Sequence, residues 1–241
     1  MSTTAGNGKV DSHLVLVDVG SRGGLQAKWH PHAESIRAIM FEPDPAEAAR
    51  LRAQIGPNSR HMVFDCGLSN IVGKQPLYVT VNALDSSLLR PNVEYLANYE
   101  IRPHFQLAGY AEVECTRYDL LYYQDQAPRP DVIKIDVQGF EYQVLLGFGS
   151  LLQDCLGIEL EAHFYELYRG QRLLHDIISL LSDYGLVLRT LQHVGQFDGD
   201  LVEVNAFFTP PRRAIASLTS LQRQKFDLLT QVWELSPYHP L

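Results

Sequence analysis

The segment VDVGSRGG, at positions 17–24, is the first whose residue types could do chemistry. A strand that breaks into glycines can turn sharply and bring backbone N–H groups close to a ligand, although the spacing here is not the G-x-G-x-x-G of dinucleotide sites. The carboxylate of Asp18, two places before Gly20, would repel a pyrophosphate and attract an ammonium or sulfonium group. This favours a ligand such as S-adenosylmethionine. The alternative is an ordinary strand-to-helix turn in which Asp18 is solvated or caps the helix.

Glu42, in MFEPDP, follows the second apolar run of the chain. An acidic residue at the end of a second strand can accept hydrogen bonds from both hydroxyls of a ribose, in NAD sites and in S-adenosylmethionine sites. The alternative is a surface carboxylate near the N-terminus of the following helix, stabilised by the helix dipole. Because the glycine-rich turn lies at a suitable distance upstream, we favour ribose binding.

Asp136 ends the run IKID, where open α/β sheets bind their ligands. We therefore interpret Asp136 as a functional residue. Lys134 points to the opposite face from Ile133 and Ile135, toward a carboxylate or solvent. Glu141, on the helix that follows, is interpreted as a solvated helix residue.

Glu159, Glu161 and His163 alternate along ELEAHF, so a strand would place all three on one face. Two carboxylates and an imidazole could supply a general base or ligands for a divalent cation. Alternatively, they line a wet crevice or pair with Arg169 or Arg172. Because such groups are expensive to bury unpaired, we expect a functional role for at least one of Glu161 and His163. We expect no metal in the site.

The elements that must position these residues are near-continuous apolar runs, which are typical of strands buried on both faces of a parallel sheet. Helical patterns follow several runs, and this alternation predicts βαβ units with right-handed crossovers. The turn-rich GQFDGD between the last two runs predicts an antiparallel hairpin. The expected strands are 14–20, 36–42, 61–68, 132–136, 156–162, 186–194 and 201–209, and the expected helices are 46–55, 140–148 and 173–185.

A single domain over residues 1–241 is expected, with one interruption at 77–117. Short strands at 77–81 and 112–116 flank a stretch rich in Tyr and Asn, and long loops in compact domains are usually lids or binding segments. We expect a lid-like insertion around 82–112, suited to hydrogen bonding and stacking on a polar ring. An amphipathic helix is expected around 216–235, and it could pack on a second copy of the chain in a homodimer.

The composition narrows the class of protein. Lys and Arg total 20 against 28 Asp and Glu, a net charge of −8, which disfavours nucleic acid and anionic membranes as partners. The chain has no run of 18 apolar residues, so we expect no membrane span. Three widely spaced cysteines and a polar N-terminus without a signal-peptide pattern favour a cytoplasmic location.

Together these blocks resemble the FkbM family of S-adenosylmethionine-dependent methyltransferases. The resemblance covers about residues 14–190, and Arg22 is a departure, since many members have Asn there. The blocks are DVGSRGG, FEPDP, SSLL at 86–89, KIDVQGFE with LLGFG, and ELEAHFYELYRGQ.

The resemblance implies a class I methyltransferase fold: a Rossmann-like α/β domain with a seven-stranded sheet, mostly parallel with a C-terminal antiparallel hairpin, and helices on both faces. It also implies S-adenosyl-L-methionine as cofactor and O-methylation of a hydroxyl on a small-molecule acceptor, a sugar, glycan or natural product. The site residues it implies are Asp18, Gly20, Ser21 and Gly24 for the methionine part, Glu42 for the ribose, Asp65 and Cys66 for the adenine, and Asp136 between cofactor and acceptor.

Methyl transfer to a hydroxyl calls for a base to take its proton, and Asp136, Glu161 and His163 are the candidates. Imidazole is the side chain that ordinarily titrates nearest neutral pH. From the residues alone, Cys66 is also explained as a small core thiol. Two other functions stay open: a NAD-dependent sugar-nucleotide enzyme, and a non-catalytic module that only binds the cofactor.

Overall fold

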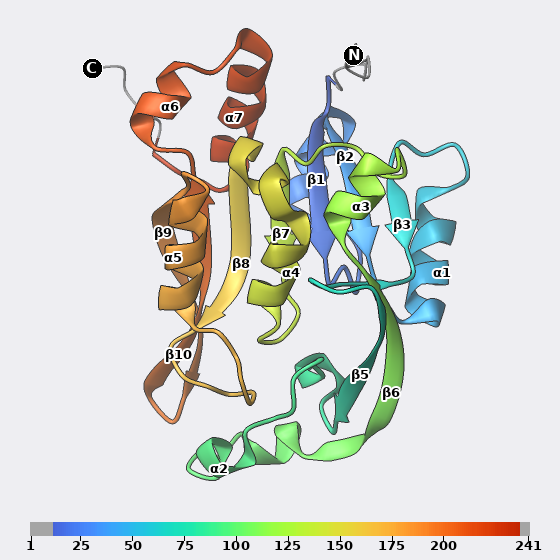
Figure 1. Cartoon of the computed structure of the whole chain (residues 1–241), viewed down its shortest axis with the longest axis vertical. Helices are drawn as coiled ribbons and strands as arrows, with labels where there is room; N and C mark the ends of the chain where they lie inside the picture. The colour runs from blue at the N-terminus through green and yellow to red at the C-terminus, as the bar shows by residue number, and fades with distance from the viewer. Residues whose placement is uncertain (1–11, 237–241) are drawn as a thin grey trace, which may run out of the picture.

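The fold is built on a seven-stranded sheet, seen in a computed structural model that describes residues 12–236 (Figure 1). Its strand order is β3-β2-β1-β7-β8-β10-β9, with the five strands from β3 to β8 parallel and β10 antiparallel to both neighbours. This confirms the predicted class I methyltransferase fold with its C-terminal hairpin. The strands are β1 (Leu14–Val19), β2 (Ile36–Phe41), β3 (Met62–Phe64), β7 (Val132–Ile135), β8 (Gly157–His163), β9 (Val187–Phe197) and β10 (Asp200–Thr209).

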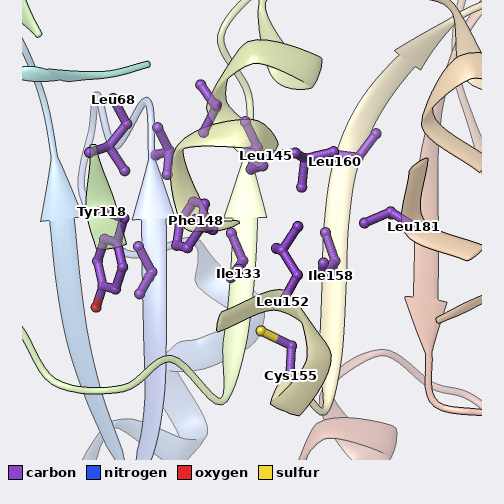
Figure 2. Close-up of a cluster of buried hydrophobic side chains, with 14 of the residues drawn as sticks. Leu68, Tyr118, Ile133, Leu145, Phe148, Leu152, Cys155, Ile158, Leu160 and Leu181 are labelled. Carbon is purple, nitrogen blue, oxygen red and sulfur yellow. The ribbon is translucent and has the colours of Figure 1, made fainter. Parts of the chain in front are cut away.

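One face of the sheet carries the larger apolar core (Figure 2). Val15, Val17 and Val19 alternate along β1 toward this face, as the period-2 pattern of a strand requires. Figure 2 shows Tyr118, Phe148 and Leu181 packing onto it with residues of β7 and β8. The covering helices are α3 (Tyr118–Tyr123), α4 (Glu141–Phe148), η4 (Gly149–Asp154) and α5 (Leu174–Asp183).

The opposite face has a smaller apolar core at the amino ends of the strands, made with Trp29 and the C-terminal helices. Phe226, Leu229 and Trp233 of this C-terminal region are buried there, and Lys225 pairs with Asp131 at 2.6 Å. The apolar face that we expected to be available to a second copy therefore packs on the chain's own sheet. The elements are η1 (Ala27–Ser35), α6 (Arg212–Ala216) and α7 (Ser220–Val232), while α1 (Pro45–Ile55) joins β2 to β3.

The interruption of the βα alternation is a small subdomain around a second, three-stranded sheet of order β4-β6-β5. In Figure 1 it occupies the end of the molecule toward which the β1 and β8 arrows point. The predicted third strand, 61–68, is wrong as one element, because it divides between β3 and β4 of two different sheets. The elements are β4 (Gly67–Leu68), β5 (Gly73–Thr80), η2 (Ala83–Asp85), α2 (Val93–Leu96), η3 (Arg102–Phe105) and β6 (Leu107–Thr116).

Tyrosines of the insertion attach it to the C-terminal hairpin. The Tyr99 hydroxyl donates to Asp200 at 3.0 Å, and its ring lies edge-on to Phe197. Tyr95 stacks on Tyr165, which follows β8. Tyr95 and Tyr99 pack against a third apolar cluster, which includes Phe197.

The turn between β9 and β10 is shorter than the predicted GQFDGD segment. The two strands continue to Phe197 and restart at Asp200, so Asp198 and Gly199 alone form the turn, both with positive φ. Asp-Gly is a favoured pair for such two-residue turns because both positions need a left-handed backbone.

None of the helices in the described part of the chain is long and apolar enough to cross a membrane.

The docking of α7 depends on the absence of a side chain at Gly157. A Cβ at this position would lie 2.4 Å from the Trp233 ring and 2.6 Å from Leu229. We predict that Gly157→Ala lowers the free energy of unfolding by about 1–3 kcal/mol, because overpacking forces a well-packed core apart. Urea denaturation measures this, with Gly109→Ala as the control, since a Cβ there meets nothing within 4 Å. Equal losses in both variants would contradict the prediction.

Candidate active site

A cavity of about 420 Å³ lies at the carboxyl edge of the parallel strands. Residues from β1, β2, β7 and β8 form one side, and residues of the insertion form the other. Of the predicted site residues it brings together Gly20, Gly24, Glu42, Asp136 and Glu161. Ligands of open α/β sheets bind at this edge, so the cavity is the candidate active site.

Lys134 lines the cavity and is buried between two carboxylates. Its Nζ is 3.4 Å from Asp18 Oδ1 and 3.5 Å from Asp136 Oδ2, and it donates to the carbonyl of Gly20 at 3.4 Å. Burial lowers the pKa of Lys134, but the charges of Asp18 and Asp136 outweigh it and raise the pKa overall. Burial likewise raises the pKa of Asp18, and the lysine opposes that shift. Lys134 therefore stays protonated and holds the ends of β1 and β7 together.

The glycine turn after β1 is shaped by close packing rather than by a phosphate. Gly20 has φ +76°, and a Cβ on it would lie 2.0 Å from the carbonyl oxygen of Asp136. The N–H groups of Gly20 and Ser21 both donate to Phe41, and that of Gly23 donates to Glu47. Because these donors are satisfied within the protein, the turn does not present them to a pyrophosphate.

Glu42 is buried at the wall of the cavity, with 3% of its surface exposed. Its Oε1 accepts a hydrogen bond from the N–H of Asp44 at 2.9 Å. Burial raises the pKa of its carboxyl, opposed by that backbone hydrogen bond and by the charge of Arg22. Arg22 lies 3.9 Å from Glu42 and 2.9 Å from Asp44. The arginine, at the position where many members of the resembled family have Asn, therefore places a cation beside Glu42, the residue expected to bind the ribose.

Gln138 is a cavity residue that sequence reasoning missed. It has φ +56°, which side-chain-bearing residues rarely adopt, and its amide donates to Asp136 Oδ1 and to Glu161 Oε1, both at 3.2 Å. The Tyr168 hydroxyl donates to its Oε1 at 3.3 Å. The available signal was Gly139 shortly after the strand end, which indicates a turn but does not by itself indicate a site.

Glu161 is a buried carboxyl at the far wall of the cavity. Burial, followed by the charges of Asp136, Glu203 and Glu141, raises its pKa to about 9. At neutral pH it is therefore protonated in the protein as it stands, and it offers a hydroxyl donor rather than a base.

His163 and Glu159 lie on the same face of β8 as Glu161, as predicted from their spacing, but neither lines the cavity. His163 is 1% exposed, with its Nε2 3.6 Å from Glu161 and 3.5 Å from Glu203. The buried Glu159 carboxylate forms an ion pair with the partly exposed Lys28. Two members of the predicted triplet are thus one layer behind the wall.

Glu141 corrects one expectation. It is 1% exposed rather than solvated, and its Oε1 accepts from the N–H groups of Val137 at 3.2 Å and Gly139 at 3.1 Å. Burial raises the pKa of its carboxyl. Glu141 therefore fixes the turn that carries Gln138.

The remaining predicted cofactor residues lie outside the cavity lining. Ser21 is buried, and its hydroxyl has no hydrogen-bond partner among the described residues. Asp65 is exposed and pairs with Arg52 at 2.9 Å, while Cys66 packs half-buried against the main core. The adenine assignments of Asp65 and Cys66 stay predictions.

The sheet order is that of the class I methyltransferase fold, and the cavity lies at the edge where such sheets bind their ligands. The chain belongs to the methyltransferase FkbM domain family, whose model matches residues 21–188. The 2-O-methyltransferase NoeI of Sinorhizobium fredii (strain NBRC 101917 / NGR234) is 30% identical over 183 residues, which cover 72% of this chain and 73% of that protein.

Solved structures similar to the chain are more distant. Magnesium protoporphyrin IX methyltransferase (ChlM) from Synechocystis PCC 6803, with bound SAM, has a TM-score of 0.44 and 10% identity. The match covers 83% of this chain and 71% of the ChlM chain. A TehB-like SAM-dependent methyltransferase from Corynebacterium glutamicum ATCC 13032 Kitasato has a TM-score of 0.39 and 11% identity, with 82% and 80% covered.

Lys134 should be indispensable for folding. We predict that Lys134→Met lowers the free energy of unfolding by about 3–5 kcal/mol, because it leaves Asp18 buried beside Asp136 without a counter-charge. The control is Lys74→Met, which breaks the exposed pair with Glu112 and should cost less than about 1 kcal/mol. Chemical denaturation compares them. Adding Asp18→Asn to Lys134→Met should restore part of the loss, and a purely additive double variant would contradict the pairing.

Proposed function

We propose that this chain transfers the methyl group of S-adenosylmethionine to a hydroxyl oxygen of a sugar, glycan or other small polyhydroxylated acceptor. The observation that carries the proposal is a single cavity in which the expected cofactor residues meet a second set of polar groups. Gly20, Gly24 and Glu42 lie toward β1 and β2, whereas Asp136, Gln138 and Glu161 lie toward β7 and β8. The name of the 30% identical relative, a 2-O-methyltransferase, supports oxygen as the methylated atom.

The residues at the first end fit the cofactor. Glu42 is a buried carboxylate at the end of β2, and hydrogen bonds from both ribose hydroxyls would compensate its burial. Asp136 brings a partly exposed carboxylate to the cavity, where it would attract a sulfonium, and Gly20 has no side chain to press against the Asp136 carbonyl. Asp18 is buried nearby and pairs with Lys134. When bound, the cofactor supplies an electrophilic methyl group. We assign the methionine part to the Gly20–Gly24 turn and the ribose to Glu42.

The second end suits a hydroxylated acceptor. Ser86 and Ser87 of the insertion face the cavity with Gln138 and Glu161, offering hydroxyl, amide and carboxyl groups, and Leu84 and Leu88 give it apolar contact. This mixture of hydrogen-bonding and apolar groups is what a sugar ring needs. The insertion covers the acceptor end in this proposal, as the lid interpretation of 82–112 predicts.

Asp136 is the best-placed base. Its side chain is 40% exposed and lines the cavity, whereas His163 is buried behind Glu161 and Glu161 is protonated. Lys134 and Gln138 each hold one of its carboxylate oxygens, which fixes the orientation of the group. In the proposed reaction, Asp136 takes the proton of the acceptor hydroxyl as the oxygen attacks, and positioning of the two substrates supplies much of the remaining acceleration.

Glu42→Ala should weaken binding of S-adenosylhomocysteine by about tenfold or more, because a hydrogen bond to a charged group is worth about 1.5–3 kcal/mol. Isothermal titration calorimetry measures the affinity, and Glu34→Gln is the control, since Glu34 is 93% exposed and pairs only with Arg60 among the contacts described. Unchanged affinity in the Glu42 variant would refute the ribose assignment. A parallel titration with NAD should show no binding.

Asp136→Asn should lower kcat by about 10²–10⁴ on the true acceptor, because the amide cannot take up a proton. Its effect on S-adenosylhomocysteine affinity, measured separately, distinguishes loss of the base from loss of the cofactor. If the variant keeps near-wild-type kcat, catalysis depends on positioning alone.

The acceptor itself is found by incubating the protein with S-adenosylmethionine and a panel of sugars, glycans and polyhydroxylated natural products. Mass spectrometry should show a product one methylene heavier together with S-adenosylhomocysteine, and NMR locates the new O-methyl group. Methylation at nitrogen or carbon would overturn the proposal, and cofactor binding without turnover on any acceptor would favour the non-catalytic module.

A further inference from the structure

Glu161, His163 and Glu203 form a cluster of potential metal ligands between β8 and β10, which lie side by side in Figure 1. One ligand atom from each residue lies within 4.8 Å of the other two. His163 and Glu203 are directly opposite each other in the antiparallel pair, and Glu161 is two residues before His163 on the same face. The strand register therefore holds the three side chains together.

The His163 ring is unusual because neither nitrogen has a hydrogen-bond partner among the described residues, although the side chain is 1% exposed. Its Nε2 is directed between the two carboxylates, at 3.6 Å from Glu161 and 3.5 Å from Glu203. Those distances exceed the usual N–H···O range, so a simple imidazolium bridge leaves the ring poorly satisfied. Two ligand atoms about 2.1 Å from one ion lie about 3.0–3.4 Å apart, which the two distances from His163 Nε2 approach.

The surroundings of the cluster are rich in carboxyl groups. Glu161 and Glu203 both lie beside His163, and the Gln138 amide joins Glu161 to Asp136. The nearby Lys134 pairs with Asp18 and Asp136. Crowded buried carboxyls are costly unless a proton or a cation relieves them.

Gly195 of β9 makes room for the third ligand. It lies opposite Glu203 in the hairpin, and a Cβ on it would be 2.2 Å from Glu203 Oε1. The missing side chain lets the glutamate fold back over the sheet toward His163 rather than extend into solvent, and only 19% of the Glu203 side chain is exposed.

We propose that Glu161, His163 and Glu203 bind one divalent transition-metal ion, of the Mn²⁺ or Zn²⁺ class, at the acceptor end of the cavity. One imidazole with two carboxylates is a donor set that these ions accept. Glu161 lines the cavity and would link the ion to its acceptor end, whereas His163 and Glu203 lie outside the cavity lining. The proposal goes beyond the methyl-transfer function, and metal binding can be measured without cofactor or acceptor.

The test uses untagged, chelator-treated full-length protein titrated with MnCl₂, with free Mn²⁺ followed by electron paramagnetic resonance. Mn²⁺ is chosen because the free cysteines Cys66, Cys115 and Cys155 bind it poorly. We expect one saturable site. Loss of an outer-shell partner alone costs about 10–100-fold in metal affinity, so Glu203→Gln and His163→Gln should each weaken binding by about tenfold or more.

His193→Gln is the matched control, because His193 is an exposed histidine on the neighbouring strand of the same hairpin, and its loss should leave the affinity unchanged. Far-UV circular dichroism verifies the fold of each variant. If His163→Gln does not fold, Glu203→Gln decides alone. No saturable site, or equal affinity in wild type and Glu203→Gln, would overturn the proposal and assign the charge relief to a proton on Glu161. Either result leaves the methyl-transfer proposal intact.

Discussion

The buried ammonium of Lys134 is the interaction on which the rest of the site depends. It joins the ends of β1 and β7 through Asp18 and Asp136, and it donates to the backbone of Gly20. A lysine at this depth stays charged because two carboxylates surround it, and the buried Asp18 in turn has the lysine as its counter-charge. The glycine turn and the carboxylate proposed as base are therefore held in one electrostatic unit, which sets the spacing between the cofactor end and the acceptor end.

One face of the sheet changes from apolar to charged residues along its strands, and the site lies at the charged end. At the amino ends Leu14, Leu16 and Val132 pack against the C-terminal helices. Toward the carboxyl ends the same face carries Asp18 and Lys134, with the polar residues of β8 beside them. Charged groups are tolerated there because they pair with one another and because the sheet opens into the cavity beneath the insertion. The opposite face stays apolar to the end and fixes the strands in place (Figure 2).

Several elements were predictable because they depend on local patterns. The buried strands, the helix at Pro45–Ile55 and the final hairpin follow from apolar runs, a helical pattern and turn residues. The division of 61–68 between two sheets was not, because nothing in an apolar run says which partner strand it will meet. The prediction for Glu141 was wrong because its environment also depends on contacts outside the local pattern. Its spacing suits a solvated helix face, but its carboxylate accepts hydrogen bonds from the turn before the helix.

By itself, the sequence determined the class I fold, the family and the positions of Glu42 and Asp136, because each follows from periodicity or from a motif within a short stretch of chain. Only the tertiary structure decided which of these groups share a cavity. It placed Gln138 between Asp136 and Glu161, set His163 behind the wall, and brought Glu203 from a distant strand to face it. Burial and charge arise from contacts between residues far apart in sequence, so the chemistry of these side chains depends on the folded chain.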